Sequence, residues 1–316
     1  MNLKDICLVI IYFLFKREIF LINSPLQLIN MVELINYRLI KKKILFVGYT
    51  DQDTIGQIRS ALAIQFINKE IKLVFLSENI NIFFVHNFLR LRKFLLFRFN
   101  ISYIGDYKYY LFREICKISK EKWIVDDGAS TLDFNYFNKI KISKSNFFTI
   151  FKISSKINQV ENKYIVCKKN FKRKVVKKGI TFVGDAVVEK DLIDKKIFLK
   201  KLKLFSKKNK DSTIYYYPHR KEKVIFDNLD MFHNIRIISN NLNIELYLLH
   251  KSYLTQRFVS FYSSALLTIK RIVPKEYNIK FQYMSFNDKY INREFILINK
   301  NTKKRYKKEG IKLIKC

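Results

Sequence analysis

Glycine and proline are scarce in this chain, which has seven and three of them among 316 residues. Its turns must therefore be built largely from Asn, Asp, Ser and Lys. The four cysteines are scattered and form no Cys-x-x-Cys pair, which excludes a small disulfide scaffold and leaves no zinc-ligand spacing. This cysteine usage is typical of a reducing compartment. The sequence also lacks a P-loop and a Gly-x-Gly-x-x-Gly fingerprint, so nothing in it indicates an ATPase or a dinucleotide enzyme.

Acidic residues are also few, with 27 Asp and Glu against 61 Lys and Arg, so the formal net charge is +34. Two explanations stay open. The excess can reflect codon bias, because Lys, Ile, Asn, Phe and Tyr are the residues of AT-rich codons. It can also serve an anionic partner, such as nucleic acid, an acidic membrane face or a phosphorylated substrate. Apolar residues make up 49% of the chain and aromatic residues 16%, which excludes a disordered protein.

The apolar run near the N-terminus is too short to cross a membrane. It covers residues 6–15, which is ten residues, whereas a helical span needs about 20. No signal-peptide cleavage site follows it. We expect a cytoplasmic protein, and peripheral contact of this segment with the anionic inner membrane stays open.

Short apolar runs alternate with amphipathic stretches, which implies parallel strands covered by helices on both faces. The expected strands lie at residues 19–22, 44–47, 71–76, 123–125, 180–183 and 213–217, and the expected helices begin after Ser24-Pro25 and cover residues 55–67 and 187–204. A basic stretch separates two such halves. We therefore predict an α/β protein with an N-terminal Rossmann-like domain over 1–167, a basic linker over 168–178 and a C-terminal Rossmann-like domain over 179–316.

A pair of carboxylates follows the expected strand at 123–125. Asp126-Asp127-Gly128 would stand at the carboxyl edge of a parallel sheet, where open α/β sheets bind ligands. Adjacent carboxylates can move one of the pair toward the range of a general base. The competing interpretation is an ordinary Asp-Gly turn. A second acidic group, Asp51-Gln52-Asp53, precedes a helix and is interpreted as a helix start rather than a metal site.

Polar residues also follow the strands of the second half. Pro218-His219-Arg220 comes after the strand at 213–217, and an imidazole beside a guanidinium suits an anionic group. Ser263-Ser264 precedes a possible helix start, where hydroxyls either bind an anion or simply cap the helix. Glu245 either accepts ribose hydroxyls or is an ordinary surface glutamate.

In this order, the motifs resemble those of bacterial sialyltransferases of the GT-B type, and most closely glycosyltransferase family 52, the lipooligosaccharide sialyltransferase group. Residues 20–28, with the sequence FLINSPLQL, are similar to the opening strand and loop of that group. Asp126-Asp127-Gly128 matches its acidic-acidic-Gly motif, and Ser263-Ser264 matches its paired Ser/Thr motif. Phe182-Val183-Gly184-Asp185 resembles the strand and turn that open the second half. Pro218-His219-Arg220 stands where the group has a His-Pro motif, with Arg220 in place of that proline.

The resemblance implies two Rossmann-like domains facing a central cleft, and inverting transfer of sialic acid or a related nonulosonic acid from its CMP ester to a cell-surface glycan, either lipooligosaccharide or capsule. It favours Asp126 as the base, with Asp127 structural or sharing that role, and His219 as a hydrogen-bond donor to the leaving phosphate. The implied donor-binding residues are Gly184, His219, Arg220, Glu245, Ser263 and Ser264, and the implied acceptor-side residues are Asn23, Ser24, Pro25, Gln27 and Gly128. Because a CMP donor carries one phosphate, we expect no metal and no other cofactor.

Two alternatives to this function stay open. The enzyme could use another activated sugar, such as CMP-Kdo or a UDP-sugar. From another class, a basic nucleic-acid-binding protein would use the same charge and aromatic residues. We expect no nucleic-acid partner, because the basic residues are dispersed and no signature of such proteins occurs. The expected partners are a CMP-sugar donor and a glycan or glycolipid acceptor.

Overall fold

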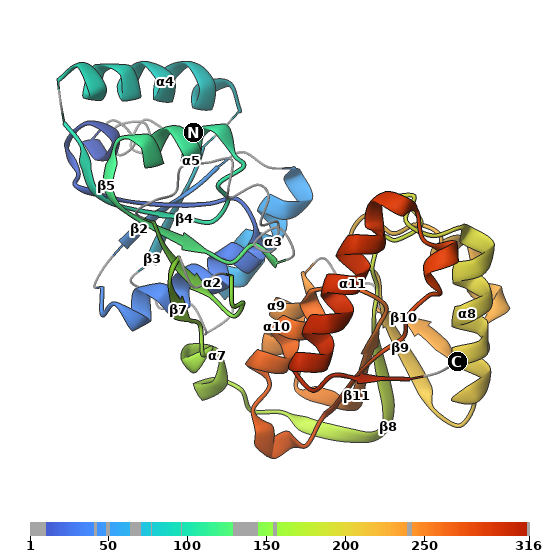
Figure 1. Ribbon diagram of the computed structural model, residues 1–316. Helices are drawn as coiled ribbons and strands as arrows, with labels where there is room; N and C mark the ends of the chain where they lie inside the picture. Colours follow the sequence, from blue (N-terminus) through green and yellow to red (C-terminus); the bar gives the residue numbers. More distant parts are fainter. Residues whose placement is uncertain are drawn as a thin grey trace. The chain divides into compact units, whose positions relative to one another are not determined.

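The chain forms two compact units, Met1–Asn170 and Phe171–Cys316, and each is built on a parallel sheet (Figure 1). The computed structural model describes residues 11–40, 43–48, 51–63, 71–76, 78–95, 97–128, 145–153, 157–238 and 242–314. Two α/β units of the Rossmann-like kind correspond to the GT-B type predicted from the sequence, so the predicted fold class is confirmed at this level.

The first unit centres on a seven-stranded sheet with the order β3-β2-β1-β4-β5-β6-β7, in which all neighbouring strands are parallel. The strands are β1 (Glu18–Ile22), β2 (Lys43–Val47), β3 (Ile71–Phe75), β4 (Phe99–Ile104), β5 (Ser119–Val125), β6 (Ser145–Thr149) and β7 (Asn158–Glu161). The helices are α2 (Pro25–Tyr37), α3 (Gln52–Ala63), α4 (Glu78–Phe94), α5 (Tyr110–Lys117) and α7 (Ile165–Lys169), and a helical turn covers residues 11–15.

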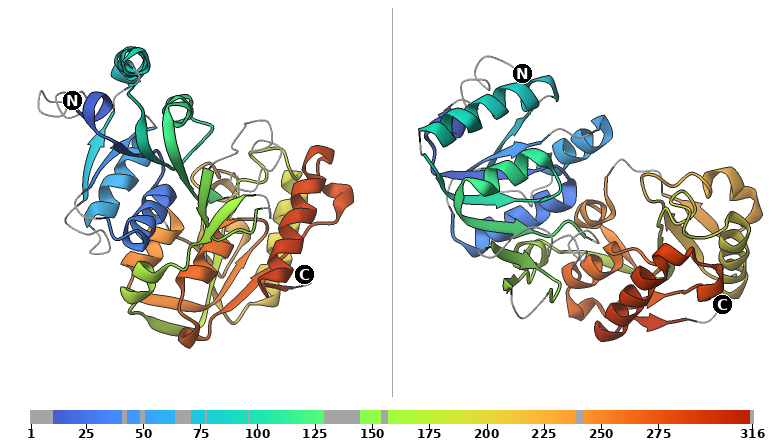
Figure 2. Two further views of the ribbon diagram at one scale, coloured as in Figure 1. Left: turned by 60° about the vertical axis from the view of Figure 1, so that its left-hand side comes forward. Right: turned by 45° about the horizontal axis from the view of Figure 1, so that its top comes forward.

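Helices cover both faces of this sheet, with α4 and α5 on one face and α2 and α3 on the other (Figures 1 and 2). Successive side chains of β1 point to opposite faces, as they must in a strand. Ile19 and Leu21 pack into a core shared with α4 and α5. Phe20 stacks on Tyr103 of β4, with ring centroids 4.3 Å apart. Strands β1 and β2 are therefore apolar at almost every position, which explains why they could be recognised in the sequence.

Two helices of the first unit begin where the sequence predicts. The Ser24 hydroxyl accepts the N–H of Gln27 at 3.3 Å, and Pro25 occupies the first turn of α2. At the start of α3, the Asp51 carboxylate accepts the N–H of Thr54 at 2.7 Å. The interpretation of Asp51-Gln52-Asp53 as a helix start is thus confirmed.

Helix α2 carries polar side chains into the interior of the first unit. The amide nitrogen of Asn30 donates to the carbonyl of Asp126 at 2.9 Å. Its amide oxygen accepts from the Asn162 amide at 3.0 Å and from the Tyr164 hydroxyl at 2.7 Å. The buried Glu33 carboxylate accepts two backbone N–H groups at the start of α7. These bonds tie α2 to the segments that follow β5 and β7.

The second unit centres on a six-stranded sheet with the order β10-β9-β8-β11-β12-β13, again with all neighbours parallel. The strands are β8 (Lys174–Val183), β9 (Thr213–Tyr217), β10 (Ile235–Ile237), β11 (Tyr253–Ser260), β12 (Lys280–Tyr283) and β13 (Lys312–Leu313). The helices are α8 (Lys195–Lys208), α9 (Ile244–His250), α10 (Ala265–Ile272) and α11 (Arg293–Lys308), with short 3₁₀ turns η2 (Phe226–Met231), η3 (Lys275–Tyr277) and η4 (Asp288–Tyr290). Helix α8 covers one face of the sheet, and α9 and α10 cover the other (Figure 1).

Two expectations about the middle of the chain are wrong. The basic stretch 168–178 is not a linker, because it contains the end of α7 and the first half of β8, which pairs with β11 from Tyr253 onward. Some of the lysines of this stretch lie on the first half of β8, which extends past β9 and, among the described strands, pairs only with β11. A run of basic residues does not by itself distinguish such a strand from a linker. The helix expected over 187–204 begins only at Lys195, where Asp194 caps it.

No helix within the part of the chain that the structure describes is both long and apolar enough to cross a membrane. Of the apolar run at 6–15, residues 6–10 lie outside the described residues, and residues 11–15 form the helical turn before β1.

The Asn30 network should contribute measurably to stability. Asn30→Ala removes the partner of three buried polar groups, so we expect the free energy of unfolding in urea to fall by about 2–4 kcal/mol. Asn301→Ala, on the exposed side of α11, is the matched control and should change it by about 0.5 kcal/mol or less. A loss below about 1 kcal/mol in Asn30→Ala would show that the network is not needed.

Candidate functional site

In both sheets the chain reverses its winding direction between two central strands. In the first unit these strands are β1 and β4, and in the second they are β8 and β11. The connections that follow the two strands of such a pair lead to opposite faces of the sheet, so no helix covers the carboxyl ends of these strands. In open α/β sheets, ligands bind at this position. The predicted site residues follow these strands or their direct neighbours.

Gln27 is the centre of the site in the first unit. Its side chain is fully buried, its amide oxygen accepts the backbone N–H of Asn23 at 2.8 Å, and its amide nitrogen donates to Oδ1 of Asp127 at 2.8 Å. The Ser24 hydroxyl donates to the same oxygen at 3.3 Å. Gly105, at the end of β4, makes room for this amide, because a Cβ there would stand 2.0 Å from Oε1 of Gln27. The loop after β1 and the end of β5 are therefore held together.

The two adjacent carboxylates have different environments. Asp126 is 2% exposed, and its carboxylate accepts the Thr149 hydroxyl at 2.5 Å and the backbone N–H of Ile150 at 2.7 Å. It points into the protein and joins β5 to β6. Asp127 is half-buried and faces Ser24 and Gln27. Of the pair, the geometry thus favours Asp127 for contact with a substrate, whereas the family resemblance favours Asp126.

Other residues of this edge complete the site. Gly128 follows with φ +64°, a conformation that favours glycine. Asp106, after β4, accepts the Asn23 amide at 3.5 Å and is absent from the sequence prediction. The sequence pattern could have indicated Asp106, since Gly105-Asp106 follows a buried strand in the same way as Gly184-Asp185. Pro25 is buried in the first turn of α2 and has a structural role there.

In the second unit, Gly184 packs directly against the loop that carries His219. The Gly184 N–H donates to the carbonyl of Tyr217 at 2.8 Å. A Cβ on Gly184 would stand 2.3 Å from a carboxylate oxygen of Glu222 and 3.0 Å from the backbone nitrogen of His219. The absence of a side chain at Gly184 therefore lets the ends of β8 and β9 approach each other.

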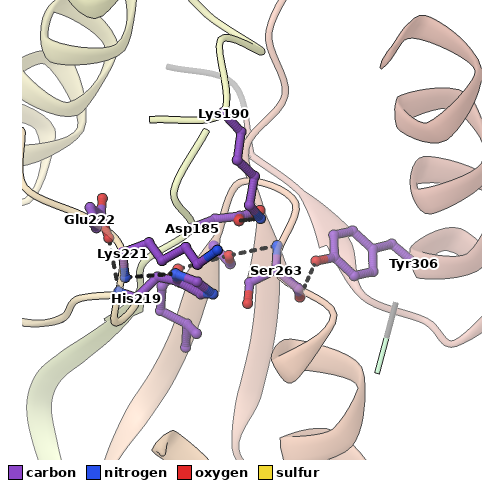
Figure 3. A network of polar contacts seen from close by, with 9 residues as sticks. Asp185, Lys190, His219, Lys221, Glu222, Ser263 and Tyr306 are labelled. Carbon is purple, nitrogen blue, oxygen red and sulfur yellow. Dashed lines mark hydrogen bonds and ion pairs between the residues drawn. The ribbon is translucent and has the colours of Figure 1, made fainter. Parts of the chain in front are cut away.

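Glu222, which the sequence analysis missed, fixes the His219 loop. It is 4% exposed, accepts the backbone N–H of His219 at 3.0 Å and accepts the Tyr216 hydroxyl. Its own N–H returns to the carbonyl of His219 at 2.8 Å, which closes the turn (Figure 3). Burial raises the pKa of Glu222 to about 8, so the carboxyl is largely protonated at neutral pH.

His219 is a neutral hydrogen-bond donor. Its Nδ1 accepts the N–H of Lys221 at 3.2 Å, which leaves the proton on Nε2. Burial lowers the pKa of His219 to about 4, and the positive charges of Lys190, Arg220 and Lys221 contribute next. The same charges create a positive potential that attracts an anion. Arg220 itself is exposed on the turn.

Ser263 and Ser264 lie at the end of β11, beside the end of β8. The Ser260 hydroxyl donates to the carbonyl of Val183 at 2.8 Å and accepts the Ser263 N–H at 3.3 Å. Tyr306, a long-range partner missed from the sequence, donates to the carbonyl of Ser263 at 2.7 Å. Figure 3 shows Asp185, His219 and Ser263 arriving from three different loops.

The helix that follows Ser264 lacks a side-chain cap. Ser264 itself has helical backbone angles and makes no capping hydrogen bond, whereas Asp194 and Asn243 cap α8 and α9. The N–H groups of Leu266 and Leu267 already donate to the carbonyls of Ser263 and Ser264. The hydroxyls of Ser263 and Ser264, which do not cap the helix, are therefore the groups at the start of α10 that suit an anion.

Glu245 lies in the first turn of α9, which follows β10 at the same edge of the sheet. It is 4% exposed and accepts the Asn243 amide at 2.9 Å. Burial raises the pKa of Glu245 to about 7. Burial, and next the Glu245 carboxylate, raise the pKa of Tyr217 at the end of β9. Glu245 is therefore no ordinary surface glutamate, although the sequence left that reading open.

The acidic side chains around His219 do not cancel its attraction for an anion. Asp185 pairs with Lys190 at 3.5 Å, and Glu222 is largely protonated. Glu189 accepts two backbone N–H groups at 2.6 and 2.9 Å. Among the described residues, no three His, Cys, Asp or Glu side chains are placed to hold a metal ion.

No protein-family model matches this chain, and no curated protein matches it. Among solved structures, it is similar to MurG from Acinetobacter baumannii, with 9% identity, a TM-score of 0.47, and coverage of 95% of this chain and 86% of that one. It is similar to the GT-B domain of a sialyltransferase from Photobacterium damselae, with 10% identity, a TM-score of 0.46, and coverage of 93% and 97%. For ADP-heptose LPS heptosyltransferase II from E. coli the values are 9%, 0.38, and 84% of each chain. Membership of glycosyltransferase family 52 stays a prediction.

The protonated state of Glu222 makes stability depend on pH in a defined direction. The folded protein keeps a proton that the unfolded chain releases above its ordinary pKa of 4.5, so the free energy of unfolding falls as the pH rises from 4.5 toward 8. Glu222→Gln cannot titrate and removes this part of the fall. Urea unfolding at a series of pH values measures the difference between the two proteins.

The exposed Glu276→Gln is the control, and its stability should follow that of the wild type at every pH. Parallel curves for the wild type and Glu222→Gln would show that Glu222 titrates normally.

Proposed function

We propose that this protein is an inverting glycosyltransferase of the GT-B type that moves sialic acid, or a related nonulosonic acid, from its CMP ester to a glycan hydroxyl. The observation that carries the proposal is the set of hydrogen-bond donors after β9 and β11. This set contains the Nε2–H of His219, the hydroxyls of Ser263 and Ser264, and the uncapped N-terminus of α10. A half-buried carboxylate, Asp127, stands at the corresponding edge of the first sheet.

The second unit binds the donor in this proposal. The phosphate of CMP lies against Ser263, Ser264 and the start of α10, with His219 donating from Nε2. As the bond from the anomeric carbon to the phosphate oxygen breaks, its electron pair stays on CMP and negative charge grows there. Neutral donors and nearby cations stabilise that charge without needing to release a proton. Glu222 and Gly184 act indirectly, because they hold the His219 loop in place.

Glu245 is suited to the ribose of the donor. Burial raises the pKa of Glu245 to about 7, so its carboxyl group is present in both the protonated and the ionised form near neutral pH. Each form has oxygen atoms that accept hydrogen bonds from hydroxyl groups. Its position after β10 puts it next to β9, whose following loop carries His219.

The first unit activates the acceptor. Asp127 takes the proton of the acceptor hydroxyl as that oxygen forms its bond to the anomeric carbon of the donor. Gln27 and Ser24 hold the Asp127 carboxylate in one orientation through Oδ1. Asp126 positions the loop by bonding to the end of β6. Asn23 and Asp106, which bond to each other at 3.5 Å, can bind further acceptor hydroxyls. The proposed acceptor is lipooligosaccharide or a capsule glycan.

CMP should bind the second unit and raise the melting temperature, since a ligand that binds only the folded state stabilises it. UDP and NAD should give no shift. His219→Ala should weaken CMP binding roughly tenfold or more, because a hydrogen bond to a charged group is lost. The exposed His233, which precedes β10 at the opposite edge of the sheet, provides the control variant His233→Ala with unchanged affinity. Thermal shift and calorimetric titration measure both effects.

A shift with UDP and none with CMP would replace the donor by a UDP-sugar and leave the transferase class intact. Binding of an oligonucleotide that falls steeply with salt, with no nucleotide shift, would favour the nucleic-acid-binding alternative.

The two adjacent aspartates should separate on substitution. Asp127→Asn keeps an oxygen for Gln27, so CMP affinity and folding should be unchanged while turnover falls roughly 10²-fold or more. Asp126→Asn places an amide NH₂ group against either the Thr149 hydroxyl or the Ile150 N–H, both of which donate to the carboxylate. Its main effect should therefore be a lower free energy of unfolding. Release of CMP from CMP-sialic acid with a panel of galactosides measures turnover, and urea unfolding measures stability.

Normal turnover in Asp127→Asn with a folded but inactive Asp126→Asn would return the role of base to Asp126. Full activity in both variants would refute the transferase mechanism.

A further inference from the structure

Large apolar side chains are exposed together with basic ones at one end of the first unit. Two segments contribute, residues 11–17 and residues 90–98, and we call their exposed side chains the α4-end patch. Its apolar members include Phe94, which is 83% exposed, and Phe15, which is 68% exposed. The other exposed apolar members are Ile11, Leu91, Leu95 and Phe97, and the exposed basic members are Lys16, Arg17, Arg90, Lys93 and Arg98.

Arg92 holds the two segments side by side. It is 2% exposed, and its guanidinium donates to the carbonyls of Phe13 and Lys16, each at 2.7 Å. It also donates to the carbonyl of Phe97 at 3.1 Å and lies 3.7 Å above the ring of Phe99. Residues 11–15 therefore lie beside the end of α4 (Figures 1 and 2). The exposed side chains of the two segments belong to one surface that Arg92 supports.

The charge of the α4-end patch has one sign. Neither residues 11–17 nor residues 86–98 contain an Asp or a Glu. Apolar groups that extend into a bilayer interface, surrounded by Lys and Arg, are the combination that binds anionic lipid surfaces. Nucleic acid also requires basic residues and can stack on aromatic rings, but it gives no role to the exposed aliphatic side chains of Ile11, Leu91 and Leu95.

A groove between α4 and α5 continues the patch. Its volume is about 430 Å³, and its apolar and aromatic lining includes Leu89, Tyr109 and Leu111, with Arg90 and Lys93 shared with the patch. One carboxylate, Glu114, also lines the groove, and it pairs with Lys117 at 2.6 Å. An apolar groove with cations at its margin suits the junction of an acyl chain and an acidic headgroup.

We propose that the α4-end patch binds an anionic membrane surface, with its apolar side chains inserted in the interface and its basic side chains near the lipid phosphates. The patch lies near the amino ends of β1 and β4, whereas Asp127 lies at the carboxyl edge of the same sheet. The binding is thus independent of the transfer reaction, and substitutions in the patch leave the Asp127 site intact.

The test is co-sedimentation of the full chain with vesicles of phosphatidylcholine alone or mixed with phosphatidylglycerol. We expect binding to the mixed vesicles, and a partition coefficient lowered roughly tenfold or more by Lys93→Gln with Phe94→Ser. The matched control is Lys203→Gln with Leu204→Ser, an exposed Lys-apolar pair on α8. It removes the same charge and should bind like the wild type.

Insertion is measured separately with Phe94→Trp. The native Trp123 is 7% exposed, so a blue shift of the emission on adding mixed vesicles reports the new residue. Equal losses in the two double variants would show that only the overall charge matters and would overturn the proposal. An unshifted Phe94→Trp emission would overturn insertion, and an effect of the patch variant on oligonucleotide binding without one on vesicles would assign the surface to nucleic acid instead.

Discussion

The reversal of winding direction within each parallel sheet is the constraint on which both candidate sites depend. Parallel strands bring all their carboxyl ends to one edge, and right-handed connections place the following helices on one face or the other. Between β1 and β4, and between β8 and β11, the chains leave in opposite directions. The loops at these points lack a covering helix and carry the polar groups. The same constraint thus places the candidate carboxylate site of the first unit and the candidate anion site of the second at equivalent edges of their sheets.

Buried polar groups then fix these loops, since an unpaired buried group is expensive and a paired one specifies a single arrangement. The Gln27 amide satisfies a backbone N–H and the Asp127 carboxylate at once. Glu222 does the same for the His219 loop through its carboxyl group. In both units a glycine, Gly105 or Gly184, lets the fixing side chain approach the backbone. The two units thus fix their loops by the same kind of contact, although the residues that make it differ.

Burial also determines the charges of the second site. It keeps Glu222 and part of Glu245 protonated and keeps His219 neutral. Lys190, Arg220 and Lys221 therefore act on a site in which few negative charges oppose them. Because the whole chain has a net charge of +34, cations alone do not distinguish these loops from the rest of the surface, whereas the burial that keeps the nearby carboxyl groups protonated does.

The sequence by itself determined the elements that local chemistry specifies: the apolar strands β1, β2 and β9, the start of α2 at Ser24-Pro25 and the helix start at Asp51. It also indicated the loops that carry polar groups, because these follow buried strands. Only the tertiary structure decided which member of the pair Asp126-Asp127 is buried, because Thr149 bonds to Asp126 from 23 residues away and Gln27 bonds to Asp127 from 100 residues away. Tyr306 and Asp106 likewise acquire their roles from residues distant in the sequence. Glu222 bonds to His219 and Tyr216, only three and six residues away, but it becomes buried only when the loop packs against Gly184. Periodicity and capping act within a few residues, whereas burial and pKa depend on groups brought together across a sheet.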